Sequence, residues 1–178
     1  PLPATDTTGR PDLGSGAHGR GYAHEPLHAR ASDHPSPCRQ WHEAAMSSPA
    51  PLPFDIYQSA QKGELQKVVK WLRKGGLTDS LCSTTTSDGR SCTYTLLHAA
   101  ATNGHLEMVK ELLTRGASVD LPTSLGFTAL MDAACSGHLS TLLVLLQHSA
   151  NPNLQDNEGY TALMVAAGQG QEACVQAL

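Results

Sequence analysis

Residues 95–117 read TLLHAAATNGHLEMVKELLTRGA, and this stretch decides the fold because its pattern recurs along the chain. Residues 128–150 (TALMDAACSGHLSTLLVLLQHSA) and 161–178 (TALMVAAGQGQEACVQAL) repeat its threonines, leucines, alanines and glycines at a spacing of 33 positions. A more divergent copy occupies residues 60–75 at an offset of 41, and the eight additional residues fall between positions 79 and 95. Self-similarity at a fixed period of this length is the signature of a repeat protein.

Each repeat predicts two short helices joined by a turn. Thr95 can cap the first helix by accepting a backbone N–H, and His98 stands three residues later, at the place of a capping-box partner. Gly104 breaks the chain, apolar residues recur at helical spacing over 106–113, and Gly116 follows as a C-terminal stop. Helices this short are not stable alone, so each unit must bury its apolar face against the next one, as in a solenoid.

The combination of these motifs resembles the ankyrin repeat. The resemblance rests on TLLHAAA at 95–101, GHLE at 104–107 and the two later openings GFTAL at 126–130 and GYTAL at 159–163. It implies an all-α ankyrin-repeat solenoid of stacked helix-turn-helix units with β-hairpin fingers over residues 54–178. The expected units are 54–91 (a degenerate first repeat with an insertion), 92–124, 125–157 and 158–178, the last of them incomplete at Leu178.

Four positions depart from the family pattern. They are Tyr57, Met131 and Met164 at the position of the family's histidine, and Ser149 at the glycine position after the third outer helix. The hydrogen-bond network that the family builds from its threonine and histidine is therefore expected only at Thr95 and His98.

The first 53 residues differ from the rest of the chain. They hold nine of the 11 prolines and five of the nine histidines, and they contain no Val, Ile or Phe. Such a segment cannot bury enough apolar surface to offset the entropy of ordering its backbone, so residues 1–53 are predicted to be disordered. The first methionine is Met46, which leaves open whether the native chain starts there or belongs to something longer.

Composition narrows the classes of partner. The chain of 178 residues carries 12 Lys and Arg against 16 Asp and Glu, for a formal net charge of -4, which argues against nucleic acid as a partner. The longest uncharged run, residues 133–155, contains polar residues that include His138, Gln147, His148 and Asn151, so no membrane span is expected. Five cysteines without a secretory signal indicate a reducing compartment, the cytoplasm or alternatively the nucleus.

Residues with reactive side chains do not form a recognisable catalytic or metal site. The groupings considered are Cys135 with His138 as nucleophile and base, Cys92 with His98 and His105 as zinc ligands, Cys82 with Cys92 as a disulfide, and a G-x-G-x-x-G match at 14–19. The repeat accounts for Cys135 and His138, the zinc spacing fits no usual ligand pair, and the glycine motif lacks a preceding strand. We expect no catalysis, no cofactor and no metal.

A column of aromatic residues is the main candidate for partner binding. Tyr94, Phe127 and Tyr160 each precede a capping threonine, where the family resemblance implies a finger that edges the concave face. Rings at such a rim are common interface anchors, although the column could instead only brace finger against finger. The polar surroundings of this candidate site are Asn103, Asp132, Ser136 and Gln169.

Two other surfaces stand out. The first repeat concentrates positive charge, which indicates either a solvated cap or a surface for an acidic partner. Its basic residues are Lys62, Lys67, Lys70, Arg73 and Lys74. The third outer helix, 139–147, is apolar nearly all round, and Leu143 and Val144 indicate either an exposed apolar surface or a contact with another segment or chain.

The expected function is a non-catalytic protein–protein interaction scaffold or adaptor that binds a protein partner on the concave face. One alternative is the N-terminal adaptor region of a larger enzyme or signalling protein whose catalytic domain lies beyond Leu178. A purely structural spacer is the other.

Overall fold

The computed structural model describes residues 51–85 and 91–178. The predicted disorder of the N-terminal segment lies, for residues 1–50, outside the described residues. The helices and strands are α2 (Phe54–Gln61), α3 (Leu65–Arg73), β1 (Cys82–Thr85), β2 (Ser91–Tyr94), α4 (Leu96–Thr102), α5 (Leu106–Thr114), α6 (Ala129–Cys135), α7 (Leu139–Gln147), α8 (Ala162–Gly168) and α9 (Glu172–Ala177).

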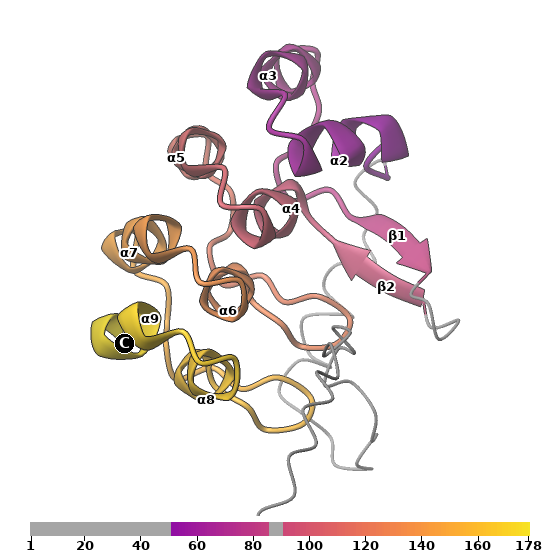
Figure 1. Ribbon diagram of the computed structural model, residues 1–178. Coiled ribbons are helices and arrows are strands. Elements are labelled where there is room, and N and C mark those ends of the chain that lie inside the picture. The colour runs from indigo at the N-terminus through magenta and orange to yellow at the C-terminus, as the bar shows by residue number, and fades with distance from the viewer. Residues whose placement is uncertain (1–50, 86–90) are drawn as a thin grey trace, which may run out of the picture.

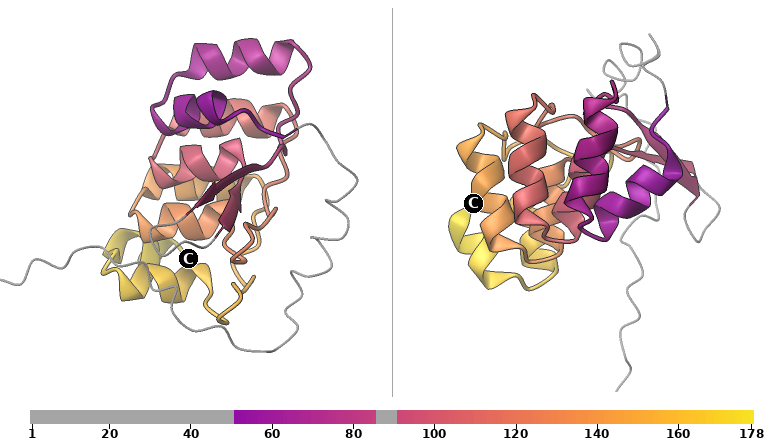
Figure 2. Two further views of the ribbon diagram at one scale, coloured as in Figure 1. Left: turned by 90° about the vertical axis from the view of Figure 1, so that its right-hand side faces the viewer. Right: turned by 90° about the horizontal axis from the view of Figure 1, so that it is seen from above.

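The helices stack in antiparallel pairs and form two layers (Figure 1). Helices α3, α5, α7 and α9 make the outer layer, and α2, α4, α6 and α8 make the inner layer. The hairpin and the long loops project from the ends of the inner helices, as the views in Figure 2 also show. We call these projections fingers, and the angle that they enclose with the inner helices is the concave face. The all-α solenoid with hairpin fingers that the sequence predicts is confirmed.

The core lies between the two layers and is built from the residues that recur at a spacing of 33. Leu97 and Leu130 on the inner helices and Val109 and Leu142 on the outer helices are almost completely buried. The alanine pairs of α4 and α6 and Ala166 of α8 are buried as well, because their small side chains let neighbouring repeats approach closely. The core therefore runs unbroken along the stack.

In the region of the additional residues of the first repeat, the described residues 82–85 and 91–94 form a two-stranded antiparallel sheet. Strand β1 pairs with β2 so that Cys82 faces Tyr94 and Thr84 faces Cys92. The two later fingers are tighter turns, in which Thr123 and Asp156 occupy equivalent positions. The backbone N–H of Thr123 donates to Phe127 O at 2.8 Å, and that of Asp156 donates to Tyr160 O at 3.0 Å.

Threonine caps begin three of the inner helices. The side-chain oxygens of Thr95, Thr128 and Thr161 each accept the backbone N–H three residues later. A complete capping box is present at Thr95, because His98 also accepts the Thr95 N–H at 3.3 Å. Met131 and Met164 stand three residues after the other two threonines and cannot return this hydrogen bond, so the expected threonine–histidine network forms at Thr95 and His98.

Two positions near repeat boundaries refine the expectations from sequence. Leu52, which falls within the segment predicted to be disordered, is buried in the core, and its N–H donates to Leu81 O at 3.0 Å. Ser149, which stands at the glycine position of the third repeat, has a φ of 65°, and Gly116 at the equivalent position has a φ of 84°. The stack thus imposes the left-handed conformation on Ser149. No helix among the described residues is long and apolar enough to cross a membrane.

Candidate partner-binding face

The first aromatic ring of the column is Tyr94, at the base of the hairpin. It is partly exposed, and its ring centroid lies 6.0 Å from that of Tyr57 and 6.5 Å from that of His98. Tyr57 belongs to α2 and is almost fully buried. Tyr94, at the start of the second repeat, therefore packs against the first inner helix. Part of its ring surface serves this packing rather than binding.

Phe127 and Tyr160 occupy the same phase in the next two fingers but differ in exposure. Phe127 is partly buried against the core, and its carbonyl oxygen accepts the Nε2–H of His98 at 3.1 Å. Tyr160 is 42% exposed, which makes it the most accessible ring of the three. The column is thus graded from a packed ring at one end to an open ring at the other.

Hydrogen bonds tie neighbouring fingers together. The Thr93 N–H donates to Ser124 Oγ at 3.1 Å, and the Asn157 N–H donates to Leu125 O at 3.1 Å. The Asn157 side chain also donates to Ser124 O at 3.0 Å. Because these bonds join successive fingers, the three rings are carried on a braced frame and not on independent loops.

Three of the predicted polar residues line up at the ends of inner helices. Asn103, Ser136 and Gln169 are the C-terminal caps of α4, α6 and α8. Asn103 and Gln169 are exposed and Ser136 is partly exposed. The Asn103 side chain donates to Ala99 O at 2.9 Å, so it is held in place at the rim. The predicted polar row exists as a geometric feature at this rim, whereas its role in binding stays a prediction.

The fourth polar residue, Asp132, lies within helix α6 and has unusual electrostatics. Its Oδ2 is buried and has no hydrogen-bond partner among the described residues. Burial raises the pKa of this carboxyl to about 8. In turn, the Asp132 charge contributes, after burial, to raising the pKa of Tyr57 to about 12 and the pKa of Cys135 above its usual value.

His98 is fully occupied by structural hydrogen bonds. Its Nδ1 accepts from the Thr95 N–H and, at 2.8 Å, from the Thr95 hydroxyl, so Nε2 carries the proton that is donated to Phe127 O. Burial lowers the pKa of His98 to about 4, which keeps the ring neutral. The ring therefore pins the second inner helix to the next finger, and neither nitrogen is open to a metal.

The chain also matches the family model for ankyrin repeats (3 copies) over residues 56–156. This match covers more than half of the 178 residues. The chain belongs to the ankyrin repeat family. A comparison with curated proteins finds no match. Ankyrin repeats are generally protein–protein interaction modules, and the family is typically non-catalytic.

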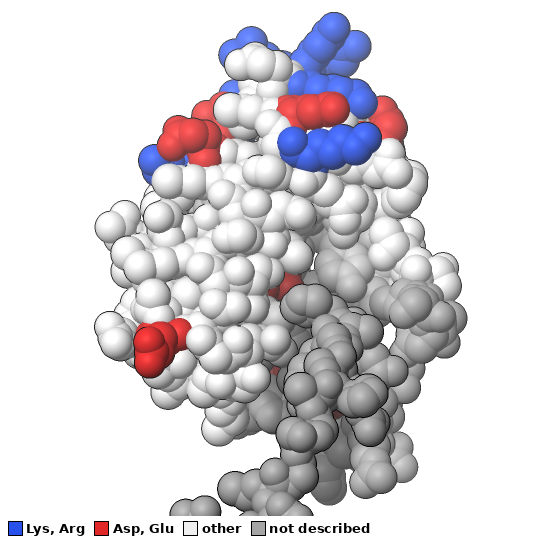
Figure 3. Space-filling model, in the orientation of Figure 1, with Lys and Arg blue, Asp and Glu red and all other residues white. Residues whose placement is uncertain are grey.

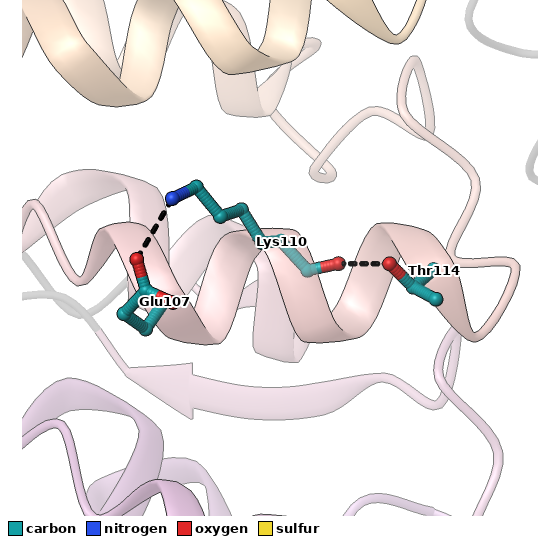
Figure 4. A network of polar contacts seen from close by, with 3 residues as sticks. All are labelled: Glu107, Lys110 and Thr114. Carbon is teal, nitrogen blue, oxygen red and sulfur yellow. Dashed lines mark hydrogen bonds and ion pairs between the residues drawn. The ribbon is translucent and has the colours of Figure 1, made fainter.

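The ankyrin stack carries its positive charge at one end, with acidic side chains beside it (Figure 3). The blue surface gathers at the top of the view, over the first helix pair, and no Lys or Arg follows Arg115. On the exposed side of α5, Lys110 Nζ forms an ion pair with Glu107 Oε1 at 2.8 Å (Figure 4). The Thr114 hydroxyl donates to the backbone oxygen of Lys110 at 2.8 Å. Exposed pairs of this kind contribute little stability, so this face reads as solvated surface.

The remaining groupings of reactive residues are explained by the ankyrin architecture. His138 Nε2 lies 3.1 Å from Thr102 O in the preceding repeat, so it braces the stack, and burial raises the pKa of the Cys135 thiol, which disfavours a nucleophilic thiolate. The described cysteines Cys82, Cys92, Cys135 and Cys174 are free. Among the described residues no three His, Cys, Asp or Glu side chains gather as a metal site.

One residue of this face was not identified from sequence. Tyr57 was noted only as a departure from the family's histidine, yet its ring packs beside Tyr94 and its phenol senses the charge of Asp132. The available signal was the replacement of an imidazole by a larger ring at an inner-helix position, where a longer side chain must reach toward the next repeat.

On the outer layer, Leu143 and Val144 behave differently. Leu143 is 42% exposed, whereas Val144 is partly buried and packs against the core. The apolar surface of α7 is therefore narrower than the sequence suggests, and Leu143 is its accessible part. Whether this surface contacts another chain stays a prediction.

Proposed function

We propose that these ankyrin repeats form a non-catalytic scaffold or adaptor that binds a protein partner on the concave face. The observation that carries the proposal is the aromatic column on the braced fingers, with Tyr160 the most exposed of its rings. Aromatic residues combine a large apolar area with few rotatable bonds, so a partner that covers them gains contact area at a small entropic cost. Asn103, Asp132, Ser136 and Gln169 supply polar contacts around the column.

We place this function in the cytoplasm, with the nucleus as the alternative. The support is that the described cysteines are free and that three of them, Cys82, Cys92 and Cys174, are buried as small apolar residues. This usage fits a reducing compartment, in which disulfides are rare.

The test compares two apolar side chains of equal exposure on opposite layers. Tyr160 and Leu143 are each 42% exposed, the first on the concave face and the second on outer helix α7. Peptides are selected from a random phage-displayed library on the full chain, and their affinities are measured by fluorescence anisotropy. We expect Tyr160→Ala to weaken the selected peptides about 30-fold, the effect of truncating a hot-spot residue, and Leu143→Ala to change affinity less than twofold.

The reverse result, loss with Leu143→Ala and none with Tyr160→Ala, would move the binding surface to the outer layer. Thermal unfolding of both variants guards against an indirect effect. Loss of stability with unchanged affinity in Tyr94→Ala, Phe127→Ala and Tyr160→Ala would show that the rings only brace the fingers, and would end the proposal.

A further inference from the structure

The inner layer contains a carboxylate oxygen that has been taken out of water without compensation. Among the described residues, Oδ2 of Asp132 is the buried side-chain oxygen or nitrogen that has no hydrogen-bond partner. Leaving such a group unpaired is costly, and native structures retain it where it serves a purpose. The carboxylate of Asp156, on the last finger, differs: its Oδ1 accepts two backbone N–H groups, from Glu158 and from Tyr160.

Among the described residues, the groups near Asp132 carry no positive charge that could neutralise it. Its carboxylate lies within electrostatic reach of the phenols of Tyr57 and Tyr94 and of the Cys135 thiol, and each of these becomes negative when it ionises. On α4, which packs against α6, Ala99 stands at the position equivalent to Asp132 and offers only a methyl group. The titratable side chain of α4, His98, is held neutral by burial.

The cations of the neighbouring repeat are engaged elsewhere. Lys110 and Arg115 lie on or just after outer helix α5 and pair with Glu107 and Glu111. No Lys or Arg occurs in residues 116–178, which include α6 and everything that follows it. Burial raises the Asp132 pKa, and no cation of the described residues offsets this shift.

We propose that Asp132 and the ring of Tyr94, both partly exposed, recognise the guanidinium group of an arginine on the protein partner. This inference rests on the proposed function and specifies the partner's chemistry. A guanidinium is planar, donates two parallel N–H groups to a carboxylate, and stacks on aromatic faces, whereas an ammonium is a strongly hydrated point charge. A metal ion fits less well, because no three ligating side chains gather among the described residues.

The first experiment follows the Asp132 carboxyl directly in the full chain. Aspartate is labelled with 13C at the carboxyl carbon, and Asp132→Asn assigns the resonance. The probe is N-acetyl-arginine methylamide, and its neutral isostere N-acetyl-citrulline methylamide is the control. We expect arginine at millimolar concentration to shift the Asp132 resonance toward the ionised form at pH 7, and citrulline to leave it unchanged.

Two results of this experiment overturn the inference. One is an Asp132 resonance that does not respond to arginine. The other is a carboxyl that is already ionised at pH 7 without the probe, because a cation of the chain itself would then fill the site.

The second experiment uses the peptides selected on the full chain. Replacing their arginine by citrulline is expected to weaken binding at least about tenfold on the wild-type chain and less than twofold on Asp132→Asn. Glu172→Gln is the matched control, because it removes the same charge from exposed outer helix α9. On this variant the full citrulline effect should persist.

The outcomes separate the two proposals. Peptides that depend on Tyr160 but contain no required arginine would remove the inference and leave the proposed function in place. Peptides that ignore the aromatic column would remove the proposed function, whatever Asp132 does.

Discussion

His138 reaches back across one repeat: its Nε2 lies 3.1 Å from the carbonyl oxygen of Thr102, and its ring covers Gly104. The same contact recurs one repeat earlier, where His105 Nε2 lies 2.8 Å from Gln61 O above Gly63. One repeat later, Gln171 takes the histidine's place and donates to Cys135 O at 3.4 Å. The inter-helix glycines Gly63, Gly104 and Gly137 are thus required by the neighbouring repeat as well as by their own backbone.

Gly104→Ala should destabilise the stack more than an alanine at an open glycine. Gly104 has a φ of 68°, and an added Cβ would lie 2.6 Å from the His138 ring. We expect a loss of roughly 2–4 kcal/mol, combining left-handed strain with overpacking. Gly116→Ala is the control, since its φ is 84° but nothing lies within 4 Å, and roughly 1 kcal/mol is expected. Urea unfolding measures both, and equal losses would show that the histidine contact is unimportant.

Ser149→Gly should stabilise the protein. Ser149 is the described non-glycine residue with a positive φ, and that conformation costs an L-residue roughly 1–2 kcal/mol. Glycine relieves this strain but loses more backbone entropy on folding, so a net gain of about 0.5–1 kcal/mol is expected. At Ser136, whose φ of -85° suits any residue, the same change to glycine should lower stability. A stability gain at both sites in thermal unfolding would contradict the argument.

Stability should fall as the pH rises from 6.5 to 8. Burial raises the Asp132 pKa from 3.8 to about 8, so between these values the folded chain keeps a proton that the unfolded chain has lost. The folded state therefore loses relative stability with rising pH until Asp132 ionises in it as well. Asp132→Asn removes this slope, and unfolding free energies measured from pH 6.5 to 8 for both proteins check it. Parallel curves would show that Asp132 is not buried as described.

His98 should produce the opposite slope at lower pH. Burial lowers its pKa from 6.5 to about 4, so in this window the unfolded state binds the proton that the folded state excludes. Stability should thus decline as the pH falls from 6.5 to 4, against the contribution of Asp132. The two effects overlap in this pH range. The free energy of unfolding is therefore measured from pH 4 to 6.5 for the Asp132→Asn variant and for the wild type. The decline toward low pH that His98 causes should be steeper in the variant.

Truncating Tyr94 should cost stability, whereas truncating Tyr160 should not. The Tyr94 ring packs with Tyr57 and His98, so Tyr94→Ala should lose about 2 kcal/mol. Tyr160 is exposed, and Tyr160→Ala should change the free energy of unfolding by at most about 0.5 kcal/mol. If Tyr160→Ala proved as costly as Tyr94→Ala, the three rings would be equivalent structural braces.

The sequence by itself determined the repeat, its period and the local devices that start and end each helix. Thr95 and His98 could be recognised as a capping box because both partners lie within one helical turn. The glycines at positions 104 and 116 could be recognised because a left-handed turn selects glycine. These features depend on residues at most a few positions apart, so the order of residues contains them.

Only the tertiary structure decided which side chains of different repeats face one another. The sequence placed Tyr94 and Tyr160 in the same phase, but stacking packs the first against Tyr57 and leaves the second open. Asp132 was predicted as a polar neighbour of the rings, and only the structure shows that its Oδ2 is buried without a hydrogen-bond partner among the described residues. The physical reason is that the desolvation and the hydrogen-bond pairing of a side chain depend on contacts between repeats. The 33-residue period places side chains at equivalent positions in each repeat, but it does not determine which residue types meet there.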